Sequence, residues 1–116
     1  MSKNLNILLC FPDEFTLNRI SKILGKNNHK MTRCIKNFDF QNHLFDDIFD
    51  VVICGLNLQS ESAIDLVKLY RFAYPHENIT KFYLFDLSEQ ADNKDLVEAK
   101  FDGRITTWDV NSYLTA

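Results

Sequence analysis

The chain has 116 residues, a length typical of one domain, with a formal net charge of −3 and a pI near 5.5. This charge argues against a nucleic-acid-binding surface, because Lys and Arg look scattered rather than gathered in a stripe. No apolar run approaches the roughly 20 residues needed to cross a bilayer, and the first residues do not resemble a signal peptide. We therefore expect a cytoplasmic domain that contacts neither membrane nor nucleic acid.

The first half of the chain alternates between strand-like and helix-like segments. A strand is expected at residues 5–10 and a helix at residues 14–26, whose apolar residues recur at spacings of three and four. Asp13 can act as the N-cap of this helix, and Gly25 lies near its end. The next expected elements are a strand at 31–35, a short helix at 39–45 and a strand at 51–54.

The second half continues the alternation. A helix is expected at residues 60–72, capped by Ser60 or Ser62 and limited by Pro75. The remaining expected elements are a strand at 82–85, a helix at 89–100, a short strand at 104–106 and a truncated helix at 109–114. This pattern predicts an α/β fold whose parallel sheet is covered on both faces. Right-handed crossovers favour the flavodoxin-like strand order 2-1-3-4-5.

We expect residues 1–116 to form a single three-layer domain, either alone or as the N-terminal part of a longer protein. Ten Phe residues predict a core rich in aromatic rings. The odd number of cysteines is typical of buried thiols rather than of a disulfide framework, for Cys10, Cys34 and Cys54. Four further aromatic residues are expected in the core or half-buried, namely Phe38, Phe40, Tyr70 and Tyr74.

Gly55 stands at the end of the third expected strand, after the apolar run of residues 51–54. In open α/β sheets, ligands and chemistry collect at the carboxyl ends of the strands. Gly55 therefore occupies a position where a reactive side chain would be held, and it has no side chain.

Three stretches carry a resemblance to a known family: residues 7–15 (ILLCFPDEF), 50–58 (DVVICGLNL) and 98–106 (EAKFDGRIT). They resemble, in turn, three parts of the receiver domain of bacterial two-component response regulators. These parts are the first strand with its acidic loop, the strand that carries the phosphoacceptor aspartate, and the run from the fourth helix into the fifth strand. The resemblance extends over essentially the whole chain and implies the receiver fold.

The family needs five chemical positions, and all five residue types are wrong here. The resemblance places the two Mg²⁺-binding acids at Phe11 and Pro12, and the phosphoacceptor at Gly55. It places the hydroxyl residue at Phe85 and the lysine at Thr107. Because phosphoryl transfer depends on positioning the group and neutralising its charge, these substitutions imply that the chemistry is lost. We expect a pseudo-receiver that is not an enzyme and uses neither Mg²⁺ nor a cofactor.

Two alternative functions stay open at this point. In the first alternative, the domain is phosphorylated at an atypical acid, Asp86 or Asp13. In the second, it binds a small molecule in the former pocket. A purely structural interpretation also exists for the acids near the carboxyl edge of the predicted sheet. In this interpretation they are helix caps and solvated loop residues, namely Asp13, Glu14, Asp86 and Asp109.

We expect Phe11 and Phe85 to turn into the former pocket, each burying on the order of 150 Å². At about 25 cal/mol/Å² this burial contributes roughly 3–4 kcal/mol apiece as an upper estimate. Trp108 has two equally weighted interpretations, as an exposed anchor for a partner or as a ring folded over the emptied pocket.

The resemblance also implies how such a domain acts. Receivers commonly contact proteins through their fourth helix, fifth strand and fifth helix. We therefore expect this chain to bind a protein partner or to form a homodimer through that face. The residues expected there are Lys94, Asp95, Glu98, Arg104, Trp108 and Tyr113.

Overall fold

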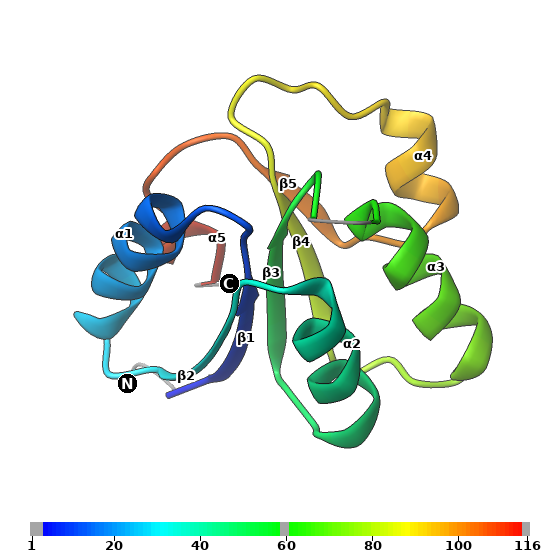
Figure 1. Ribbon diagram of the computed structural model, residues 1–116, viewed down its shortest axis with the longest axis horizontal. Helices are drawn as coiled ribbons and strands as arrows, with labels where there is room; N and C mark the ends of the chain where they lie inside the picture. The colour runs from blue at the N-terminus through cyan, green and yellow to red at the C-terminus, as the bar shows by residue number, and fades with distance from the viewer. Residues whose placement is uncertain (1–3, 59–60, 115–116) are drawn as a thin grey trace.

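The computed structural model describes residues 4–58 and 61–114, which form a five-stranded parallel sheet with helices on both faces (Figure 1). The strands are β1 (Asn6–Cys10), β2 (Lys30–Cys34), β3 (Val51–Gly55), β4 (Lys81–Phe85) and β5 (Gly103–Ile105). The helices are α1 (Glu14–Gly25), α2 (Asn37–Asp46), α3 (Ala63–Ala73), α4 (Asn93–Glu98) and α5 (Asn111–Leu114). The strand order is β2-β1-β3-β4-β5, so the predicted topology and the short last helix are confirmed.

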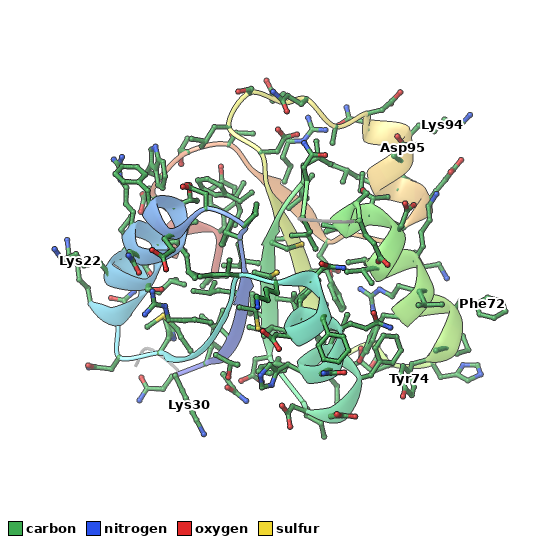
Figure 2. All side chains as sticks on the ribbon, in the orientation of Figure 1. Lys22, Lys30, Phe72, Tyr74, Lys94 and Asp95 are labelled. Carbon is green, nitrogen blue, oxygen red and sulfur yellow. The ribbon has the colours of Figure 1, made fainter. Side chains whose placement is uncertain are left out.

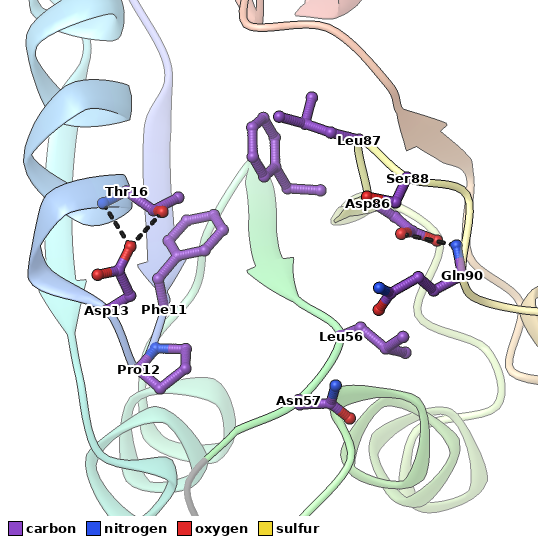
Figure 3. A pocket seen from close by; sticks show the side chains of 11 residues that line it. Phe11, Pro12, Asp13, Thr16, Leu56, Asn57, Asp86, Leu87, Ser88 and Gln90 are labelled. Atoms are coloured by element: carbon purple, nitrogen blue, oxygen red, sulfur yellow. Dashed lines mark hydrogen bonds between the residues drawn. The ribbon is translucent and has the colours of Figure 1, made fainter.

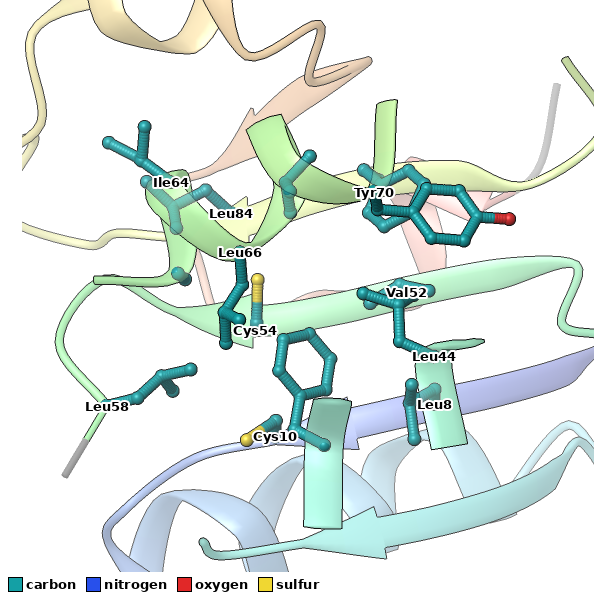
Figure 4. Close-up of a cluster of buried hydrophobic side chains, with 14 of the residues drawn as sticks. Leu8, Cys10, Leu44, Val52, Cys54, Leu58, Ile64, Leu66, Tyr70 and Leu84 are labelled. Carbon is teal, nitrogen blue, oxygen red and sulfur yellow. The ribbon is translucent and has the colours of Figure 1, made fainter. Parts of the chain in front are cut away.

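Two apolar cores lie on the two faces of the sheet, because alternate strand residues point to opposite sides. α1 and α5 cover one face, where Leu17, Ile20 and Leu24 of α1 are buried. α2, α3 and α4 cover the other face, shown in part in Figure 4, where Phe40 and Phe82 are fully buried. The aromatic core is thus confirmed.

The aromatic prediction is confirmed for Phe40 and Tyr70, which are buried, and wrong for Phe38 and Tyr74, which are exposed. Phe38 lies in the first turn of α2, where the side chain projects from the helix into solvent. Tyr74 follows the end of α3 and stacks on Tyr70 with ring centroids 5.1 Å apart. Both rings therefore lie at the margin of the molecule.

Three helices, α1, α3 and α4, begin at local side-chain caps. Asp13 accepts a hydrogen bond from the backbone N–H of Thr16 at 2.9 Å, which confirms it as the N-cap of α1. Ser62 caps α3 by accepting from Ile64 N–H, whereas Ser60 lies outside the described residues. The predicted start of the fourth helix at residue 89 is wrong, because α4 begins at Asn93 after its cap, Asp92.

The three cysteines lie side by side on neighbouring strands, with Cys10 in register with Cys34 on β2 and with Cys54 on β3. All three are buried free thiols, as predicted. Burial raises the pKa of Cys10 to about 12 and that of Cys34 to about 11, and it raises the pKa of Cys54 further. Because the thiolate is the reactive form, these thiols are inert at neutral pH.

Candidate functional site

The carboxyl edge of the sheet brings together four of the five positions that a receiver would use. Phe11 and Pro12 directly follow β1, and Gly55 ends β3. Phe85 ends β4 and lies in register with Gly55. The fifth residue, Thr107, lies exposed in the link between β5 and α5.

Aromatic rings fill the space between these strand ends. Phe11 and Phe85 are both buried, and their rings meet edge to face with centroids 5.7 Å apart. Trp108 covers Phe85 with centroids 5.0 Å apart, and the guanidinium of Arg19 lies 3.9 Å from the Trp108 ring centre. The prediction that Phe11 and Phe85 turn into the pocket is confirmed.

Gly55 is required by the position of Phe11. A Cβ atom added to Gly55 would lie 3.2 Å from Cδ1 of Phe11 and 4.0 Å from Cδ of Pro12. The requirement is for space and not for an unusual backbone, because no described glycine has positive φ. The Phe11 ring thus occupies the space into which a side chain at position 55 would extend.

Asp86 and Arg104 form a second, polar structure beside the rings. Asp86 is buried, and its two carboxylate oxygens accept the backbone N–H groups of Gln90 at 3.0 Å and Ala91 at 2.9 Å. Nε of Arg104 lies 3.6 Å from Oδ2 of Asp86, and the same guanidinium donates to the carbonyl of Ala91. The interpretation of Asp86 as a solvated loop acid is therefore wrong.

This polar structure explains why the helix prediction failed between residues 89 and 92. The carboxylate of Asp86 captures backbone N–H groups that a helix would leave at its N-terminus, and so it holds the segment as a loop before α4. Arg104 reaches this loop from β5, in a distant part of the sequence. No local pattern in the sequence signals such a contact.

A hollow of about 270 Å³ remains above the rings (Figure 3). Two carboxylates line it, Asp13 and Asp86, and both are engaged by hydrogen bonds from the protein. None of the described residues that line it is Lys or Arg. Within the described part of the chain there is also no group of three His, Cys, Asp or Glu residues that could hold a metal ion.

The six residues expected on the interaction face divide into two groups. Lys94, Asp95 and Glu98 of α4 are exposed, and Figure 2 shows Lys94 and Asp95 pointing away from the molecule. The other three are engaged internally: Arg104 with Asp86, Trp108 with Phe85, and Tyr113, whose hydroxyl accepts the N–H of Thr106 at 3.1 Å. For Trp108, the ring folded over the former pocket is the interpretation that holds.

One further exposed surface on this side was missed by the sequence analysis. Phe72 of α3 and Val97 of α4 have exposed fractions of 86% and 74%. A hollow of about 440 Å³ beside them is lined by Lys68, Arg71, Phe72, Pro75, Glu98 and Lys100. The signal was available, since Phe72 lies two positions after Tyr70 and so off the buried face of α3.

No helix of the described residues is long and apolar enough to span a membrane.

No protein-family model matches the sequence, and no curated protein is significantly similar to it. Solved structures of receiver domains are similar in fold. A CheY-like receiver domain from Methylobacillus flagellatus matches with a TM-score of 0.82 and 20% identity, covering 97% of each chain. The chemotaxis response regulator CheY4 of Vibrio cholerae matches with a TM-score of 0.83 and 12% identity, also over 97% of each chain.

A CheY-like receiver domain from Methanospirillum hungatei matches with a TM-score of 0.81 and 13% identity, covering 97% of this chain and 91% of that one. These identities are too low to carry function across, but the agreement in structure spans nearly the whole of each chain. The chain therefore has the CheY-like receiver fold, and the aromatic rings of Phe11 and Phe85 lie together at its strand ends.

Proposed function

We propose that this chain is a pseudo-receiver, a cytoplasmic signalling domain of the two-component type that acts through protein contacts without being phosphorylated. The receiver fold supports the signalling role. The single observation that supports independence from phosphorylation is the contact between Phe11 and Gly55. The Phe11 ring takes the space beside Gly55, where an added Cβ atom would lie only 3.2 Å from Cδ1 of that ring.

The electrostatics of the edge point the same way. A phosphoryl group needs cations or Mg²⁺ to neutralise its developing charge. The hollow above the rings is instead lined by two carboxylates and by no Lys or Arg among the described residues. The lysine position of a receiver is taken by Thr107, which is neutral. An anionic group would therefore be repelled at this site.

Phosphorylation at an atypical acid is the second candidate, and its support is that Asp13 and Asp86 both line the hollow. Against Asp86, both of its oxygens already accept backbone N–H groups and it is paired with Arg104. Against Asp13, its carboxylate caps α1 by accepting from Thr16. An acyl phosphate at Asp86 would occupy a carboxylate oxygen that already accepts a backbone N–H group, and one at Asp13 would change the carboxylate that caps α1.

Small-molecule binding in the former pocket has less support. Ligand pockets are typically about 300–1,000 Å³, and this hollow is about 270 Å³. The space next to Gly55 that would enlarge it is taken by the Phe11 ring. We therefore place the function on the outer surface of the domain.

The contact surface that we propose is centred on α4. Lys94, Asp95 and Glu98 give it charge, and the exposed side chains of Val97 and Phe72 give it apolar area. Arg104, Trp108 and Tyr113 are engaged in contacts within the domain, and we leave them out of this surface. Apolar side chains surrounded by charged ones are typical of protein interfaces.

Incubation with acetyl phosphate and Mg²⁺, followed by intact-mass measurement, tests phosphorylation independence. We expect no mass increase, because no described side chain at the edge combines an accessible carboxylate with cations. The positive control is the Burkholderia pseudomallei response regulator, whose solved structure carries a phosphorylated aspartic acid. Addition of one phosphoryl group to this chain would contradict the proposal, and its loss in Asp13→Asn or Asp86→Asn would identify the acceptor.

A further inference from the structure

Charge is segregated along the first half of the chain. Residues 15–38 contain six Lys and Arg residues and no Asp or Glu, namely Arg19, Lys22, Lys26, Lys30, Arg33 and Lys36. Residues 39–65 contain six acids and no Lys or Arg, namely Asp39, Asp46, Asp47, Asp50, Glu61 and Asp65. For a protein with a net charge of only −3, this separation assigns the cations and the acids of this half of the chain to different segments.

The basic surface lies on the outer side of α1. Phe15, Arg19, Lys22 and Lys26 follow one another at spacings of four, three and four, so they form one stripe along the helix. We call these four residues the basic stripe. The interpretation that the cations are scattered is therefore wrong for α1. Figure 2 shows Lys22 projecting away from the sheet, with Lys30 of β2 on the same side of the molecule.

The basic stripe is available for contact. Among the described residues neither Lys22 nor Lys26 forms an ion pair. Phe15 has an exposed fraction of 66%. A hollow of about 420 Å³ lies along the stripe, lined by Phe15, Asn18, Arg19 and Lys22. The stripe thus offers an apolar ring and unpaired cations next to a depression.

The acidic surface is concentrated where α2 ends, at the opposite face of the sheet from α1. Asp46 is the last residue of α2, Asp47 is its C-cap, and Ile48 follows with an exposed fraction of 82%. We call these three residues the acidic turn. Asp47 contacts His43 at 2.8 Å, while Asp46 has no ion pair in the described part of the chain.

The acidic turn disagrees with two rules that favour folding. Acids at the C-terminus of a helix oppose the helix dipole, which favours cations there. A large apolar side chain as exposed as Ile48 adds nothing to the core. Positions that break local rules are expected to serve function. The acidic turn therefore offers exposed charge and an exposed apolar side chain for a contact with another molecule.

We propose that the acidic turn of one molecule binds the basic stripe of a second molecule of the same chain. In this contact Asp46 and Asp47 face Lys22 and Lys26, and Ile48 packs against Phe15. A second copy is the occupant with the required chemistry, because each surface carries the charge that the other lacks and an exposed apolar side chain that can pack against that of the other. The inference goes beyond the proposed function, since it uses neither α4 nor the edge of the sheet.

The two surfaces lie on different helices on opposite faces of the sheet, so the contact is head to tail. Each molecule in a pair would keep one unused basic stripe or acidic turn. Contacts of this kind extend into open chains unless the rotation closes them into a ring. We therefore expect concentration-dependent growth beyond a dimer, with affinity that falls as salt screens the charges.

Sedimentation velocity over a wide concentration series tests this proposal. The wild-type chain should associate at low ionic strength and dissociate at about 1 M salt, where the Debye length is about 3 Å. Lys22→Glu with Lys26→Glu, or Asp46→Lys with Asp47→Lys, should each weaken the association constant by about tenfold or more. The variant carrying all four substitutions keeps the net charge of −3 and should associate like the wild type.

Lys68→Glu with Lys94→Glu is the matched control, because it makes the same change in net charge on α3 and α4. It should leave the association unchanged, and thermal melting should show every variant folded, since all six positions are exposed. A monomeric wild type, or a four-fold variant that stays monomeric, would overturn the proposal. So would heparin binding through the basic stripe without self-association. Loss of association in the α4 control alone would instead support the α4 surface.

Discussion

At the carboxyl edge of the sheet, Phe11 and Phe85 are buried against each other and Arg19 is stacked on Trp108. On the outer side of α1 and at the end of α2, by contrast, Lys22, Lys26 and Asp46 face solvent without ion pairs in the described part of the chain. The edge has the position of an active site and the composition of a core. The helix surfaces carry unpaired charges that make no contact with the core.

This contrast separates the part of the molecule that stabilises the fold from the part that is available to bind another molecule. Carboxylates clustered at a sheet edge repel one another when no cation is bound. Here Phe11 and Phe85 fill the edge and add buried apolar area. Substitutions at the edge should therefore reduce stability, and substitutions on the two charged surfaces should change association and leave stability nearly unaltered.

The largest expected effect is at Phe11. Phe11→Ala should lower the free energy of unfolding by about 3–5 kcal/mol, because it removes a buried ring from between Gly55 and Phe85. Gly55→Ala should lower it by about 1–3 kcal/mol, because its new Cβ meets the Phe11 ring. Urea denaturation measures both changes.

The double variant sharpens this prediction. In the Phe11→Ala background, Gly55→Ala should leave the free energy of unfolding almost unchanged or raise it by about 0.4–1 kcal/mol. A gain of this size is expected where a glycine does not have positive φ. The two changes should thus couple by about 1 kcal/mol or more. Additive costs would show that Gly55 is present for a reason other than the Phe11 ring, and the edge would no longer count as a packed core.

The sequence predicted the fold well because its signals are local. Apolar runs such as residues 51–54 mark buried strands, and the cap at Asp13 marks the start of α1. Strand order followed from the handedness of crossovers and needed no contact information. The burial of Phe11 and Phe85 was also accessible, because strand ends of a parallel sheet meet at one edge.

What the sequence could not provide were contacts between distant residues. The cation over Trp108 comes from Arg19 on α1, and nothing near Trp108 indicates it. The start of α4 was misplaced because Arg104 and Asp86 hold residues 90 and 91 in a loop. The basic stripe was overlooked because its cations alternate with apolar residues in sequence and become neighbours only on the helix.

A smaller effect is expected at Asp86. Asp86→Asn should lower the free energy of unfolding by about 1.5–3 kcal/mol, because a charged acceptor of two backbone N–H groups is lost. The matched control is Glu89→Gln, whose carboxylate lies 3.7 Å from the same arginine but is two-thirds exposed. That change should cost less than about 0.5 kcal/mol. Equal costs in urea denaturation would mean that the polar structure at the edge is not a buried one.

The smallest effect concerns pH and the cap of α1. Hydrogen bonds from the Thr16 hydroxyl and then from its backbone N–H hold the pKa of Asp13 below its ordinary value of 3.8. A carboxyl group whose pKa is lower in the folded state stabilises the fold above its unfolded pKa. That stabilisation is lost as the pH falls through the lower, folded value.

Asp13→Asn keeps a capping side chain but removes the charge. At neutral pH its free energy of unfolding should therefore be lower than that of the wild type. This difference should shrink as the pH falls below 3.8. Thr16→Val removes the hydroxyl and should narrow the pH range over which the stabilisation is lost, because only the backbone N–H groups of residues 15 and 16 then lower the pKa of Asp13. Urea denaturation from about pH 6 to about pH 2 measures these differences. A constant difference across that range would mean that Asp13 is not held as a charged cap, and the rings would then be the main stabilising feature of this edge.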